Sequence, residues 1–181
     1  MAVHTFALPA SVSASGYAAE IRVTQTTDEE RVKSTLTLTI WLKADRGYND
    51  PFLFAGADGA ADFEVNGAVI GTIPGIGSTP YQVYIPEANT YYQLRSGNAP
   101  ASWTTEIDHE VDGSAQAHIE LSAFVRNDAS HYYTATWDDT IDLAPIDVGN
   151  AYVGGEAAVP YVYDGGWKAA NAHIYDGGEW K

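Results

Sequence analysis

The stretch Leu36-Thr37-Leu38-Thr39-Ile40-Trp41-Leu42 decides the fold that this sequence predicts. Its large aliphatic residues occupy the even positions, and threonine or tryptophan occupies the odd ones. This period-2 alternation of apolar and β-favouring residues is typical of a strand with one buried face. A helix would mix leucine and threonine around its whole circumference, because side chains three and four positions apart share a helix face. We therefore predict a strand over residues 32–43 whose apolar face the rest of the chain covers.

Further alternating segments lie on both sides of this stretch. They predict strands over residues 3–8, 19–25, 62–65, 68–73, 81–85, 103–111, 115–126 and 132–143. Turn signals separate them: Asn66-Gly67 and Asp112-Gly113 are dipeptides that take positive φ in tight turns, which makes Gly67 and Gly113 turn glycines. We predict a turn at residues 26–30, a long loop with an apolar anchor at 51–54 over residues 44–61, and an irregular segment over residues 86–100.

These strands define the predicted fold class. About seven to nine short strands with turn signals and no helical periodicity indicate two packed antiparallel sheets. We predict an all-β, antiparallel β-sandwich over residues 1–147, immunoglobulin-like or jelly-roll-like. One sequence leaves the strand order open.

The C-terminus carries a repeat. After a predicted spacer, residues 148–157, a tail over residues 158–181 holds two copies of a Tyr-Asp-Gly-Gly unit. Each copy predicts a minimal hairpin with its tyrosine and tryptophan as cross-strand neighbours. Such a hairpin is marginal alone and needs a partner surface; the alternative is an unstructured chain end. The candidate interface residues are Tyr161, Tyr163, Trp167, Tyr175 and Trp180, and the turn glycines are Gly165, Gly166, Gly177 and Gly178.

The charge and composition of the chain exclude several classes of binding partner. The 181 residues include 9 Lys and Arg against 24 Asp and Glu, a net charge of −15. A surface this acidic repels phosphate backbones and anionic lipids, so we expect neither nucleic acid nor membrane as a partner. There is no cysteine, which excludes disulfides and thiolate metal sites. The N-terminus lacks the basic and apolar regions of a signal peptide.

No arrangement of residues indicates catalysis. The sequence has no phosphate-binding loop, no dinucleotide fingerprint and no nucleophile elbow, so we expect no enzyme, no cofactor and no metal. Asp45, Asp50, Asp58 and Asp62 could offer oxygen ligands to calcium, but their spacing favours a solvated loop.

Aromatic residues are the better candidates for binding. Tyr91 and Tyr92 fall in the irregular segment, where aromatic rings can hold sugar rings or anchor an interface. Trp41 lies on the outward side of its strand, and we expect that side to be covered.

The order of features resembles the siphovirus-type tail and baseplate structural proteins of phages. The resemblance rests on three stretches of the body and on the Tyr-Asp-Gly-Gly-x-Trp-Lys ending, which is similar to C-terminal repeats of phage minor tail proteins. The body stretches are residues 21–36, Phe63-Glu64-Val65-Asn66-Gly67, and Trp103 to Ile146 with His109-Glu110-Val111-Asp112-Gly113-Ser114 within it. The family has an Asn-rich turn where this chain has residues 26–30. The resemblance implies a β-sandwich that builds tails or contacts host surface glycans, and it supplies no catalytic residues.

We therefore expect a phage virion structural protein of the tail or baseplate, with a role in assembly or host-surface attachment. It would be assembled in the host cytoplasm, where structural disulfides are rare, and would act extracellularly within the virion. Its expected partners are other virion proteins and its own copies, as a homo-oligomer that analogy with phage fibres makes a trimer. The alternatives are a carbohydrate-binding or receptor-binding module, and a capsid decoration or filament subunit.

Overall fold

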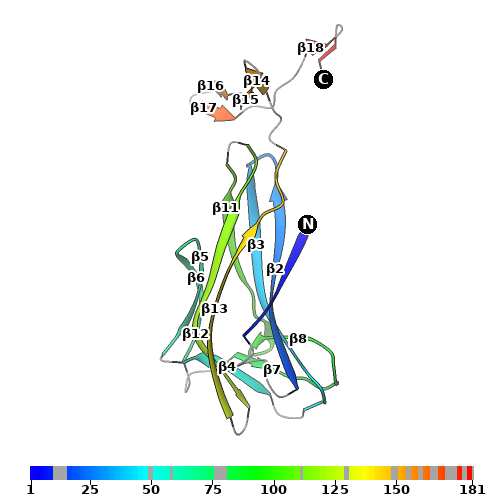
Figure 1. The fold of residues 1–181 in the computed structure, drawn as a ribbon, viewed down its shortest axis with the longest axis vertical. Helices are drawn as coiled ribbons and strands as arrows, with labels where there is room; N and C mark the ends of the chain where they lie inside the picture. Colours follow the sequence, from blue (N-terminus) through cyan, green and yellow to red (C-terminus); the bar gives the residue numbers. More distant parts are fainter. Residues whose placement is uncertain are drawn as a thin grey trace.

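The structure is a computed structural model that describes residues 1–9, 16–48, 51–57, 59–75, 81–110, 112–128 and 131–147, and short strands between residues 151 and 180. The described residues form strands and no helix, so the predicted all-β fold class is confirmed. Long strands run along the body (Figure 1). No helix in this part of the chain has the length and apolarity needed to cross a membrane.

Two antiparallel sheets make the body. Sheet A has the order β1-β2-β3-β11, with β8 also paired to β3; its strands are β1 (Ala2–Ala7), β2 (Tyr17–Asp28), β3 (Lys33–Ala44), β8 (Tyr92–Gln93) and β11 (Trp103–Asp108). Sheet B has the order β10-β9-β7-β4-β12-β5-β6, with β13 also paired to β12. Its strands are β4 (Phe52–Gly56), β5 (Ala61–Val65), β6 (Ala68–Ile73), β7 (Tyr81–Val83), β9 (Arg95–Ser96), β10 (Ala99–Pro100), β12 (Gln116–Asp128) and β13 (His131–Asp142).

Strand β3 is the centre of sheet A, and the prediction of its buried face is confirmed. Its even-numbered residues are buried and its odd-numbered residues are half-buried along the whole strand. Leu38 is 0% exposed and is paired with Val23 on β2 and with Trp103 on β11. The alternation in the sequence therefore fixes which face of this strand enters the core.

An aromatic contact joins the two sheets. The Trp103 ring of sheet A lies 4.7 Å from the Phe63 ring and 5.8 Å from the Tyr81 ring, centroid to centroid, and both partners belong to sheet B. Gly71 on β6 makes room for it, because a Cβ at that position would lie 1.8 Å from Trp103 Cδ1. The missing side chain of Gly71 thus lets the indole fill the space between the sheets.

Strand β4 corrects the sequence prediction. Residues 44–61 were predicted as a loop with an apolar anchor, but Phe52–Gly56 is a strand that pairs with β12 and β7. Phe52 and Phe54 are 2% and 0% exposed. Strand β12 takes β4 along one half and β5 along the other, and a bulge opposite β13 lies between the two. There the Asp62 N–H donates to Ser122 Oγ at 2.7 Å.

The predicted turns have mixed outcomes. Asn66 and Gly67 have φ values of 52° and 77° between β5 and β6, which confirms the tight hairpin. Gly113 also has positive φ, 81°, but its turn leads from β11 in sheet A to β12 in sheet B instead of closing a hairpin. Strand β2 runs to Asp28, so the predicted turn at 26–30 lies two or three residues further along the chain.

Two segments predicted to be irregular contain short strands. Residues 86–100 include β8, β9 and β10. The predicted spacer, residues 148–157, overlaps a hairpin made of β14 (Ala151–Val153) and β15 (Glu156–Ala158). Two more hairpins follow, formed by β16 (Tyr161–Tyr163) with β17 (Trp167–Ala169) and by β18 (Tyr175–Asp176) with β19 (Glu179–Trp180).

Candidate functional site

A shallow groove forms where the short strands of the two sheets meet. It has a volume of about 320 Å³ and is lined by Tyr84, Pro86, Tyr92, Gln93, Arg95 and Pro100. Tyr84 follows β7 and is 49% exposed, which is high for a side chain of this size. Its hydroxyl donates to Gln82 Oε1 at 3.3 Å, and Gln93 Nε2 donates to the Ala101 carbonyl at 2.9 Å. The groove thus combines aromatic rings with amide and guanidinium groups.

Tyr92 lies on the core side of this groove. Its partial shielding from water raises the pKa of its phenol, and the nearby Glu87 carboxylate adds to the increase. A neutral phenol can both donate and accept hydrogen bonds, and its ring offers an apolar face. A ring-shaped polar ligand, such as a sugar, matches this combination.

The neighbouring Tyr91 is in a different environment, on the outward face of sheet A. The Arg22 guanidinium lies 4.1 Å from the Trp41 ring centroid and 5.3 Å from that of Tyr91, and Lys43 Nζ lies 4.7 Å from the latter. Burial raises the pKa of Tyr91, and a hydrogen bond with Glu20 raises it further. Tyr91 therefore packs on cations of its own chain and holds the segment before β8 against sheet A.

Trp41 belongs to the same cluster. Its ring is covered by Arg22, and its Nε1–H donates to Thr39 Oγ1 at 2.9 Å. The expectation that the outward side of β3 is covered at this point is met. Of the two tyrosines predicted as a binding pair, the structure places only Tyr92 in the groove.

The terminal hairpins bring each predicted Tyr–Trp pair into register. Tyr163 is opposite Trp167, and Tyr175 is opposite Trp180. The second copy has one extra residue, Glu179, which pairs with Asp176, so its loop is one residue shorter than that of the first copy. The predicted cross-strand pairing is thus confirmed at the level of the backbone. The turn glycines Gly165, Gly166, Gly177 and Gly178 lie outside the described residues, as do the side chains of the tail.

A serine and a histidine make a pair that resembles catalytic machinery. Ser34 Oγ lies 2.7 Å from His109 Nε2, and His109 Nδ1 lies 2.7 Å from the Gly113 carbonyl oxygen. Ser34 is 0% exposed, however, so no substrate can reach its hydroxyl in this arrangement. The pair belongs to a buried polar network, and buried polar groups of this kind are stable because they are hydrogen-bonded.

Gln25 is the centre of that network. Its side-chain Nε2–H donates to Ser34 Oγ at 2.8 Å and to the Ala144 carbonyl at 3.0 Å, and its Oε1 accepts from the Ala144 N–H at 2.8 Å. The side-chain amide of Gln25 thus makes with Ala144, just after β13, the pair of hydrogen bonds that a neighbouring strand would make. No local pattern in the sequence signals this contact, because it joins residues 119 positions apart.

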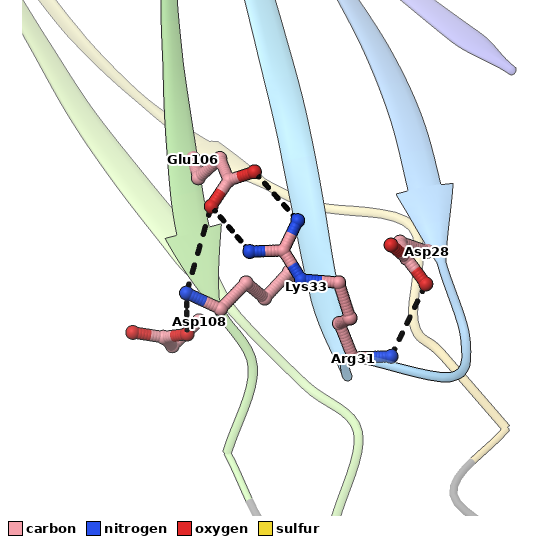
Figure 2. Close-up of polar contacts among 5 residues, drawn as sticks. All are labelled: Asp28, Arg31, Lys33, Glu106 and Asp108. Carbon is pink, nitrogen blue, oxygen red and sulfur yellow. Dashed lines mark hydrogen bonds and ion pairs between the residues drawn. The ribbon is translucent and has the colours of Figure 1, made fainter.

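A network of ion pairs stands beside the turn between β2 and β3 (Figure 2). The Arg31 guanidinium donates to both carboxylate oxygens of Glu106, at 2.9 and 3.1 Å, and Lys33 Nζ bridges Glu106 and Asp108 at 3.6 and 2.9 Å. The hydrogen bond from Arg31 lowers the pKa of Glu106. Lys33 is half-buried and the other groups are exposed, so they orient β3 and β11 rather than form a buried site.

Acidic residues also line a cleft of about 630 Å³ at Asp108, Glu110 and Asp142. Asp108 is paired with Lys33, and Asp142 Oδ1 accepts from Gln116 Nε2 at 2.6 Å. Among the residues that the structure describes, no three histidine, aspartate or glutamate side chains are grouped to hold a metal ion. Of the aspartates considered for calcium, Asp50 and Asp58 lie outside the described residues, Asp45 follows β3 and Asp62 lies on β5.

Comparisons with protein-family models and with curated proteins find no match to this chain.

Proposed function

We propose that the protein is a structural component of a phage virion, in the tail or baseplate, with the sandwich as its body and the terminal hairpins as its attachment element. The observation that carries this proposal is the Tyr–Trp register of the two hairpins. Tyr163 with Trp167 and Tyr175 with Trp180 stay opposite each other although Glu179 lengthens the second copy. A repeat that keeps one aromatic pair across a change in loop length is built around that pair.

The terminal hairpins need a partner surface to be stable. Each of the three is a two-stranded sheet of its own and is unpaired with sheets A and B in the described part of the chain. Two-stranded hairpins are at best marginally stable in water. Docking on another virion protein, or on further copies of the chain, would supply the missing packing. The resemblance to phage tail proteins supports the same setting.

The test replaces Trp167 and Trp180 by alanine in the full chain. We expect an unchanged far-UV spectrum and melting of the body, a lower mass per particle by light scattering, and loss of incorporation into virions. The matched control replaces both residues by phenylalanine, which keeps a ring opposite each tyrosine and is expected to retain assembly. If the alanine variant assembles and enters virions as the parent chain does, the hairpins are not the attachment element.

A second candidate function, saccharide binding, is favoured by the groove at Tyr84 and Tyr92. Its rings, with Gln93 and Arg95 beside them, offer the stacking surface and the planar donors that sugars require. A glycan array would test it: Tyr84→Ala and Tyr92→Ala should abolish a signal that the parent chain gives. Tyr91→Phe is the control, since Tyr91 is outside the groove lining. No signal with the parent chain, or equal signals for all variants, would reject this function.

A further inference from the structure

Strand β1 presents a free edge of sheet A. It pairs with β2 on one side through six residues in unbroken register, from Ala2 opposite Gln25 to Ala7 opposite Glu20. The next residue, Leu8, donates its N–H to the Ala19 carbonyl at 2.8 Å in the same register. Because hydrogen-bonded pairs alternate in an antiparallel ladder, the N–H and C=O groups of the odd-numbered residues of β1 point away from β2. Among the described residues, no strand pairs with that side.

This edge has none of the usual protection against pairing. The odd-numbered residues Val3, Thr5 and Ala7 are uncharged and exposed, with Val3 at 59%. The strand contains no proline, no charged side chain and no bulge. Natural edge strands are usually blunted by such features, and an edge that lacks them is a template for another strand.

The other outer strands differ in this respect. Strand β11 carries Glu106 and Asp108, and β13 carries three aspartates between residues 138 and 142. Strand β10 contains Pro100, β6 pairs with β5 through a bulge, and β8 has only two residues. Within the described sheets, β1 is thus the neutral and regular edge. On a chain with a net charge of −15, this is where a second copy can approach at the lowest electrostatic cost.

The edge is also held firmly in place. The Phe6 ring of β1 lies 5.5 Å from the Trp137 ring of sheet B, centroid to centroid, so β1 is anchored to both sheets. A strand that is already ordered loses little further conformational entropy when it gains a partner.

We propose that two copies of the chain associate through β1, antiparallel about a two-fold axis at Thr5. In this register Thr5 is opposite Thr5 of the partner subunit, and Val3 is opposite the partner's Ala7. All three outward-pointing residues of each copy then form hydrogen-bonded pairs, and sheet A continues across the contact. The register is self-complementary, which an isologous contact requires. This inference does not depend on the terminal hairpins or on the proposed function.

Cysteine cross-linking tests both the contact and its register, because the chain has no cysteine of its own. Hydrogen-bonded antiparallel partners have Cα atoms about 5.5 Å apart, within the range of a disulfide. Thr5→Cys should therefore give a cross-linked dimer on mild oxidation. Val3→Cys should not, since two such residues would lie about four strand positions, or ~14 Å, apart. Thr104→Cys, on the charged outer strand β11, is the matched control and should stay uncross-linked.

Proline substitution tests the hydrogen bonds. The Thr5 N–H points away from β2, so Thr5→Pro removes no bond within the subunit but blocks the centre of the contact. Thr104 is equivalent on β11: the His109 N–H donates to the Val32 carbonyl at 3.0 Å, and this alternation directs the Thr104 N–H outward. We expect Thr5→Pro to halve the mass per particle toward the 19.5 kDa subunit and Thr104→Pro to leave it unchanged.

Several results would overturn the proposal. The first is that light scattering finds no even-numbered assembly of the parent chain. The second is that Thr5→Pro folds and has the same mass per particle as the parent chain. The third is that Thr5→Cys cross-links no faster than Thr104→Cys. A mass that falls on loss of Trp167 and Trp180 but not with Thr5→Pro would assign association to the hairpins alone. That outcome would reject the β1 contact while leaving the proposed function intact.

Discussion

Replacing Leu38 by aspartate tests the buried face of β3, and the structure sets the size of the effect. Leu38 is 0% exposed and sits between Val23 and Trp103 in register. Loss of the leucine side chain costs about 2–5 kcal/mol of unfolding free energy, by analogy with truncation to alanine. Burial also disfavours the charged carboxylate, and the ~3 pH units between its ordinary pKa and neutral pH add about 4 kcal/mol. The total is comparable to the whole stability of a typical domain, about 5–15 kcal/mol.

The matched control is Thr37→Asp, which adds the same charge one residue away. Thr37 is on the half-buried outward face, paired with Thr24 on β2 and Thr104 on β11. A carboxylate there stays hydrated, so we expect a loss of about 1 kcal/mol, the scale of strand propensity. Urea unfolding followed by tryptophan fluorescence measures both variants.

The pH dependence of the Leu38→Asp penalty separates charge from packing. Burial raises the folded-state pKa of the new carboxyl above its unfolded value, so below the unfolded value both states are protonated and only the packing loss remains. The penalty then grows as the pH rises from the unfolded pKa toward the folded pKa. Leu38→Asn cannot titrate and should show no such trend relative to the parent chain. Equal losses for Leu38→Asp and Thr37→Asp would refute the assigned face of β3.

Three further substitutions test other contacts. Gly71→Ala should cost about 1–3 kcal/mol of stability and shift tryptophan emission, because the new methyl group collides with Trp103; an unchanged stability would show that the sheets are not packed this closely. Gln25→Leu should lower the free energy of unfolding, measured by thermal unfolding, by about 1–3 kcal/mol for each backbone or hydroxyl group that it leaves unpaired. An unchanged stability would show that Gln25 does not hold the chain after β13. Glu106→Gln should flatten the acid limb of a stability–pH curve, because Arg31 lowers the pKa of Glu106 in the folded state. The resulting stabilisation is present above the unfolded-state pKa and is lost as the pH falls through the folded-state pKa. An unaltered acid limb would contradict that pKa shift.

Local patterns in the sequence determined the parts of this protein that depend on near neighbours in the chain. The alternation from Leu36 to Leu42 specified the face of β3, because successive side chains of a strand point to opposite sides whatever the strand pairs with. Asn66-Gly67 specified its hairpin through the positive φ that both residues tolerate. The Tyr–Trp pairing of the tail followed in the same way, since a short loop leaves few possible registers.

The sequence predicted only part of the candidate groove. Tyr91 and Tyr92 are adjacent and have the same chemistry, so composition and position gave them the same predicted role. The structure separates them, because neighbouring residues of an extended segment face opposite ways and sheet A offers Arg22 and Lys43 on one side only. Tyr84 completes the groove from the segment that follows β7, and nothing near it in the sequence signals that partner.

Long-range pairing was decided by tertiary structure. Residues 51–54 were predicted as an anchor within a loop, but β12, some seventy residues later, pairs with the strand Phe52–Gly56 that contains most of them. Gly113 has the positive φ that a tight turn favours, yet its turn joins β11 of sheet A to β12 of sheet B. Turn chemistry and alternation constrain each strand separately. The choice of partner depends on the apolar area that distant segments bury together, and that sum is defined only once the whole core has formed.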